Sequence, residues 1–71
     1  MILITTIARS VVVSFDEFDN RPVEINIEGE RMKKELKTKD TDLIKIPMEN
    51  GKYKITVKKG SAVCTKTVFI H

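Results

Sequence analysis

The sequence predicts an all-β protein, a small antiparallel Greek-key β-sandwich of about six or seven strands. Three observations lead to this fold class. Apolar and polar residues alternate through 23–28 and 51–59, the period of a strand with one buried face. Val and Ile, which favour strands, dominate residues 2–15. Turn formers at Asn50-Gly51 and Lys59-Gly60-Ser61 separate apolar runs, and no segment carries a strong helical pattern.

The first fifteen residues predict either two short strands, Ile2–Ala8 and Val11–Phe15, or one long bent strand. This apolar start lacks the basic residues of a signal peptide and falls short of the roughly 20 apolar residues of a membrane-spanning helix. We therefore expect strands and no membrane span. Asp16–Pro22 collects turn formers and acids, which predicts an acidic turn before the next strand.

Val23–Glu28 predicts a strand, and Gly29-Glu30 is suited to a type II′ turn that folds the chain back on it. This register opposes Val23 to Leu36 but also Ile25 to Lys34 on the inner face. Because an isolated buried ammonium is costly, we expect either an edge strand whose Lys34 reaches water or a shifted register. Residues 33–42 are polar enough that strand, loop and helix all stay open.

The strongest local pattern is Asp42–Lys59, which predicts two strands paired across Asn50-Gly51 as a hairpin. A loop of two or of four residues places the same side chains inward: Ile44, Ile46, Met48, Tyr53, Ile55 and Val57. The outer face then combines Leu43 and Lys45 with Lys54 and Lys58 as a candidate interaction surface. Pro47 disagrees with the two-residue loop, which requires an N–H at that position.

The last strand is predicted over Ala62–Ile70, where both side-chain parities contain apolar residues. A strand covered on two sides, or one with a bulge midway, would give that mixture. Cys64 has no catalytic partner nearby in sequence and is interpreted as a buried thiol.

Length and composition limit the number of domains and the compartment that this chain can have. Residues 1–71 suffice for one domain, a single β-sandwich, and are too few for two cores. One cysteine excludes an internal disulfide and favours a reducing compartment; the cytoplasm is favoured, with surface or virion association left open.

Residues 1–31 hold three Arg and six acids, whereas residues 32–71 hold ten Lys and four acids. Such a basic half could bind polyanions, but Lys is also the usual solvated residue of exposed strands.

Two segments resemble a known group of domains. PVEINIEGERM and IKIPMENGKYKITVKKG are similar to PEGA domains and to the regulatory-like domains of carboxypeptidases, which are immunoglobulin-like or transthyretin-like sandwiches. The polar connection between them lacks the Gly-x-Thr-Pro segment usual in PEGA domains. The resemblance implies binding or spacing without catalytic residues. It also implies that Asn50, Gly51 and Tyr53 form a structural corner, in which the Tyr53 hydroxyl bonds upstream backbone.

No paired catalytic groups, phosphate-binding loop or metal-ligand cluster is visible, so we expect neither an enzyme nor a cofactor. The favoured function is a noncatalytic protein-interaction or assembly module, with a protein partner or self-association through strand edges and a Lys-rich face. The alternative is a small OB-like β-barrel that binds single-stranded nucleic acid through the basic C-terminal half.

Overall fold

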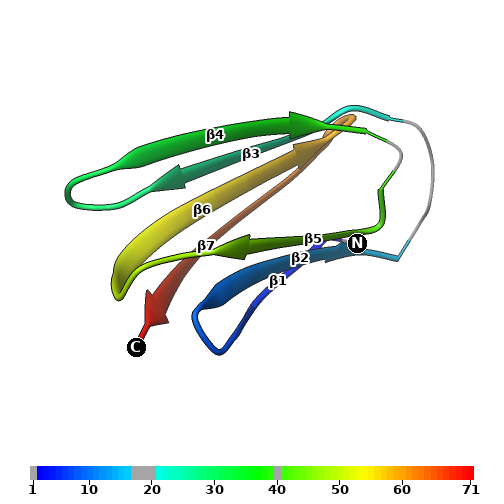
Figure 1. Ribbon diagram of the computed structural model, residues 1–71. Helices are drawn as coiled ribbons and strands as arrows, with labels where there is room; N and C mark the ends of the chain where they lie inside the picture. Colours follow the sequence, from blue (N-terminus) through cyan, green and yellow to red (C-terminus); the bar gives the residue numbers. More distant parts are fainter. Residues whose placement is uncertain (1, 17–20, 40) are drawn as a thin grey trace.

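The computed structural model describes residues 2–16, 21–39 and 41–71, so the acidic turn expected before Pro22 lies largely outside the described residues. The described part of the chain forms strands and no helix, which confirms the all-β prediction (Figure 1). It therefore contains no helix that could cross a membrane. The strands are β1 (Ile2–Ile7), β2 (Ser10–Phe15), β3 (Val23–Glu28), β4 (Lys33–Thr38), β5 (Leu43–Pro47), β6 (Gly51–Lys59) and β7 (Ala62–Ile70).

The strands form two antiparallel sheets that face each other without closing into a barrel. One sheet has the order β1-β2-β5 and the other the order β4-β3-β6-β7. Figure 1 shows them as two layers, with β3, β4 and β6 above β1, β2 and β5. The arrangement is sandwich-like and differs from the barrel of the OB-type alternative.

One hydrophobic core fills the space between the layers. Its fully buried side chains come from the inward parity of the central strands: Val11, Val13, Val23, Ile25, Ile27, Ile55 and Val57. Burial of each such side chain contributes about 1.5 to 3 kcal/mol relative to exposure. The inward set predicted around Asn50 is buried or half-buried here, so the predicted faces of both strands are confirmed.

The predicted hairpin across Asn50-Gly51 is wrong, although both of its strands exist. Strand β5 pairs with β2, whereas β6 pairs with β3 and β7. Residues 48–50 therefore cross from one sheet to the other. The physical reason is that alternation determines which face of a strand is buried and leaves its neighbour undetermined. Ile46 and Ile55 reach the same core from opposite layers instead of facing each other across one ladder.

Pairing with β2 also explains Pro47. Phe15 N donates to Asp42 O at 3.0 Å, and Met48 N donates to Arg9 O at 2.8 Å. Because hydrogen-bonded and non-hydrogen-bonded pairs alternate along an antiparallel ladder, Pro47 opposite Ser10 is a non-hydrogen-bonded pair. Its nitrogen faces the open edge of the sheet, where no ladder bond is lost.

The chain turns between β3 and β4 through a wider loop than the predicted Gly29-Glu30 turn. Gly29 N donates to Met32 O at 2.9 Å, and the register opposes Ile27 to Lys34 and Ile25 to Leu36. The register is thus shifted by two residues. The shift keeps Lys34 opposite an inward side chain, but Lys34 lies on an edge strand and is exposed, so its ammonium reaches water there as expected. Residues 33–38 are strand, which decides among the three options left open there.

The ends of the sequence lie on neighbouring strands of the two layers. Strands β1 and β2 are separate and join through Ala8-Arg9, with Ala8 at a φ of 53°. Strand β1 runs beside β7, where Lys66 Nζ donates to Ile4 O at 3.0 Å. The β6–β7 register is continuous, and Val63 and Phe69 are exposed, so β7 is neither bulged nor covered on both sides in this chain.

Candidate functional site

The four residues predicted as one interaction surface lie on opposite faces of the molecule. Leu43 and Lys45 belong to β5 in the three-stranded sheet, while Lys54 and Lys58 belong to β6 in the four-stranded sheet. All four are exposed. The predicted combination of Leu43 with Lys54 and Lys58 is wrong because β5 does not pair with β6. The molecule instead has two separate outward faces.

The outward face of the three-stranded sheet, here called the apolar face, consists of three rows across β1, β2 and β5. Residues opposite each other in a ladder point to the same side of a sheet, so the register defines the rows. They are Leu3–Ser14–Leu43, Thr5–Val12–Lys45 and Ile7–Ser10–Pro47. Within this set Lys45 is the single ionisable side chain.

The apolar face leaves large hydrophobic side chains in water. Leu3 is 54 % exposed, and Ile7 and Leu43 are each 58 % exposed. Val12, in the central row, is only 7 % exposed although it lies outside the core cluster. Covering the three larger side chains would stabilise a complex by about 1 kcal/mol each, since full burial of Leu or Ile is worth about 1.5 to 3 kcal/mol.

The outward face of the four-stranded sheet, here called the charged face, has the opposite character. Its register forms the rows Lys37–Glu24–Lys58–Val63, Glu35–Asn26–Thr56–Thr65 and Lys33–Glu28–Lys54–Thr67. Glu24 and Glu28 thus each stand between two lysines. The ammonium of Lys33 lies 3.8 Å from the carboxylate of Glu28. The basic residues of the C-terminal half are therefore interleaved with acids from β3.

Aromatic side chains on the charged face are sparse. Phe69 extends the face at the end of β7, is 58 % exposed and lies 5.8 Å from the ammonium of Lys52. Tyr53 points into the core instead. Binding of single strands relies on several stacking aromatics along a basic groove. The described part of this face lacks such a series.

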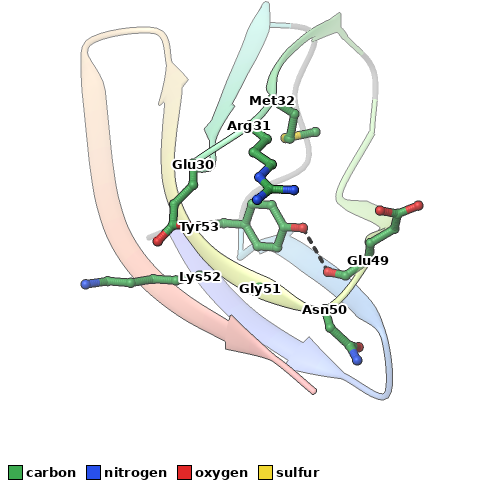
Figure 2. Close-up of a pocket in the computed structure, with 8 residues that line it drawn as sticks. All are labelled: Glu30, Arg31, Met32, Glu49, Asn50, Gly51, Lys52 and Tyr53. Atoms are coloured by element: carbon green, nitrogen blue, oxygen red, sulfur yellow. Dashed lines mark hydrogen bonds between the residues drawn. The ribbon is translucent and has the colours of Figure 1, made fainter.

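Tyr53 occupies the inner edge of a hollow at one end of the sandwich. Its hydroxyl donates to Glu49 O at 2.9 Å, four residues upstream (Figure 2). A side chain at Gly29 would come within 2.8 Å of the Tyr53 ring, and one at Gly51 within 3.3 Å of its hydroxyl. Gly51 also has a φ of 154°, which glycine adopts more readily than other residues. The two glycines therefore make room for a buried tyrosine that spans both loops.

The hollow itself has a volume of about 480 Å³ and opens widely to solvent. Figure 2 shows that its lining comes from the β3–β4 loop, the crossing between β5 and β6, and the start of β6. The residues are Glu30, Arg31, Met32, Glu49, Asn50, Gly51, Lys52 and Tyr53. Two acids and two bases balance in charge, and the lining contains neither a nucleophile beside a base nor a histidine.

Other reactive groups are also separated from one another. Cys64 is half-buried against the core, where a buried thiol was expected, and His71 is exposed beyond β7. Lys59 is buried, with its ammonium 4.6 Å from the centre of the Phe15 ring, and so links the two layers. Among the described residues, no group of three or more Asp, Glu, His or Cys side chains could hold a metal ion.

Comparisons of the chain with protein-family models, curated proteins and solved structures find no match. The candidate site is therefore defined by the geometry of this chain alone.

Sequence reasoning found one strand of the apolar face and missed the rest. Alternation predicts that Leu43 and Lys45 are exposed, whereas it assigns Leu3, Ile7 and Val12 only to strands. A usable signal was present: residues 2–7 and 10–15 have apolar side chains on both parities, more than one core face requires. The residues that share the outer face follow only from the pairing of β2 with both β1 and β5.

Proposed function

We propose that this chain is a noncatalytic protein-interaction or assembly module that binds its partner through the apolar face. The carrying observation is the set of large, half-exposed side chains Leu3, Ile7 and Leu43 on one sheet face with a single charge. Large apolar side chains that share one exposed sheet face are typical of an interaction site in a small protein. The proposed contact surface is therefore the apolar face, in place of the strand edges and the Lys-rich face expected from the sequence.

The proposed domain type is an immunoglobulin-like Greek-key sandwich of the PEGA-like kind. The strand order supports it, since the chain passes between the layers three times and places β6 between β3 and β7. The Tyr53 bond to Glu49 O also supports it. In immunoglobulin-like sandwiches, a tyrosine near the start of the sixth strand bonds backbone a few residues upstream and fixes that corner. Such domains bind or space other proteins without chemistry of their own.

The interaction surface can be tested by photo-crosslinking in cells that express the full chain. A photoreactive amino acid at position 43 reports on the apolar face, and one at position 63 is the matched control, because Val63 is 61 % exposed on the charged face. We expect position 43 to give adducts with one defined protein, which mass spectrometry identifies as a second copy or another chain. Position 63 should give none of these adducts. Equal labelling from both positions, or none from position 43, would contradict the proposal.

A further inference from the structure

We infer that the occupant of the apolar face is a second copy of this chain, packed face to face about a two-fold axis parallel to β2. The inference rests on the proposed function and names its partner. Each subunit would cover the same surface on the other, which is the isologous contact of most homodimers. Dimerisation then buries the apolar faces of both subunits.

Charge supports this particular axis. A two-fold axis along β2 brings β1 of one subunit over β5 of the other, so each Lys45 lies opposite Thr5 of the partner subunit. Lys45 can then extend its ammonium past a small polar residue to the rim. An axis across the strands would instead bring Lys45 onto Lys45 of the partner subunit, which is repulsive. Only the first arrangement avoids like charges at the contact.

The sizes of the side chains fit the same axis. Along the axis lie the residues of β2, which are small or of medium size: Ser10, Val12 and Ser14. On both sides lie larger apolar residues, with Leu3 over Leu43 of the partner subunit and Ile7 over Pro47 of the partner subunit. Because twisted sheets approach closely at their centres and separate toward corners, small central and larger lateral side chains match that contact.

The area of the face sets the strength of the dimer. Three strands about 4.8 Å apart, each about 20 Å long, give a footprint of roughly 300 Å² per subunit. A standard stable interface covers about 800 Å² per partner. The dimer is therefore expected to be weak and reversible, with a dissociation constant in the micromolar to millimolar range.

Net charge predicts how the stability of the dimer depends on salt concentration. Each chain has a net charge of +3, so two copies repel each other at long range. Salt screens this repulsion and strengthens apolar association, so the dimer should tighten as the salt concentration rises. Nucleic-acid binding has the opposite dependence, because it releases counterions.

Sedimentation equilibrium of the purified full chain over a wide concentration range tests the dimer. We expect reversible dimerisation that strengthens with salt and that Leu43→Asp weakens at least about tenfold. Val63→Asp is the control, since its side chain is equally exposed on the charged face, and it should dimerise like the parent chain. Circular dichroism melting verifies that both variants are folded.

A charge variant tests the direction of the two-fold axis, because the correct axis predicts a tighter dimer. Thr5→Glu places each new carboxylate opposite Lys45 of the partner subunit and should tighten the dimer about three- to tenfold at low salt. With an axis across the strands, the two new carboxylates would face each other and the dimer would weaken. Thr65→Glu, on the charged face, is the control and should change little.

The outcomes separate this inference from the proposed function. A chain that stays monomeric at about millimolar concentration, or a dimer that Leu43→Asp leaves intact, overturns the second copy as occupant. A dimer that Thr5→Glu weakens overturns the axis. If the purified chain is monomeric while position 43 crosslinks to a different protein, the inference fails and the proposed function stands. If neither occurs, both fail.

Discussion

The two outward faces of this small sandwich expose side chains of opposite character to water. Both belong to antiparallel sheets that cover one core from either side. The charged face places Glu24 and Glu28 opposite lysines of both neighbouring strands, and Lys33 forms an ion pair with Glu28. The apolar face leaves Leu3, Ile7 and Leu43 about half exposed, with Lys45 as its ionisable member.

The difference teaches that the two faces contribute differently to the stability of the monomer. Cross-strand pairs of opposite charge contribute roughly 0.2 to 1 kcal/mol each to the sheet that carries them. Exposed leucines contribute little to a monomer, and they become favourable only when another surface covers them. The charged face therefore serves the fold, and the apolar face serves the proposed contact.

The largest expected effect tests whether the two faces belong to one cooperative unit. Ile46→Asp alters the inner side of the three-stranded sheet, and Ile55→Asp alters that of the four-stranded sheet; the two side chains are 4 % and 0 % exposed. Each change places a carboxylate in the shared core and should cost at least about 4 kcal/mol, enough to unfold a domain of this size. Chemical denaturation monitored by circular dichroism measures this. Loss of only one sheet would show that the layers fold independently.

Glu24→Lys breaks the charge pattern of one face without touching the other. It would place three lysines in one row and should lower the free energy of unfolding by about 1 to 2 kcal/mol at low salt, with a smaller effect at high salt. Glu30→Lys in the β3–β4 loop adds the same charge outside the ladder and serves as the control. Urea denaturation at two salt concentrations measures both. Equal effects of the two variants would show that the rows on the charged face contribute nothing specific.

Tyr53→Phe tests the link at the crossing between the two sheets. The variant keeps the ring between the glycines but removes the hydrogen bond to Glu49 O, which should cost about 1 kcal/mol. Hydrogen exchange should increase first in residues 48–52. An unchanged free energy of unfolding would mean that water replaces the hydroxyl at no cost, and that the corner depends on packing alone.

The smallest expected effect concerns the link between β1 and β7. Lys66→Met keeps an apolar stem but removes the donor to Ile4 O, and it should cost about 0.5 kcal/mol because the pair is partly hydrated. Thermal denaturation is the measurement, and Lys39→Met, at an exposed residue that follows β4 and belongs to no ladder, is its control. A loss above that of Tyr53→Phe would place the dominant link between the layers at this edge instead.

Much of the fold could be predicted from the sequence because strand identity and inward parity are local properties. Alternation alone assigns Ile44, Ile46, Tyr53 and Ile55 to the correct side, whichever strands are paired. The neighbours of each strand are not local: β5 buries the same residues whether it pairs with β6 or with β2. The contact of the buried Lys59 ammonium with the Phe15 ring joins strands of different sheets. No sequence pattern predicts that these two residues meet.

The candidate site was predictable only in part for the same reason. Leu43 was recognised as an exposed apolar residue because its own strand alternates cleanly. Leu3 and Ile7 lie in a run where apolar residues occupy both parities, so alternation could not separate inner from outer side chains. Their convergence with Leu43 depends on the central position of β2, which is a property of topology.

Pro47 has a consequence for how far assembly can proceed. The open edge of β5 lacks a donor at this residue, β1 and β7 lie beside each other with Lys66 bound to Ile4 O, and β4 presents lysines. Growth of either sheet by strand addition is thereby disfavoured at the edges most exposed to it. A molecule that joins through a face but not through its edges forms a finite particle of two subunits, whereas edge-to-edge addition would propagate into a fibre.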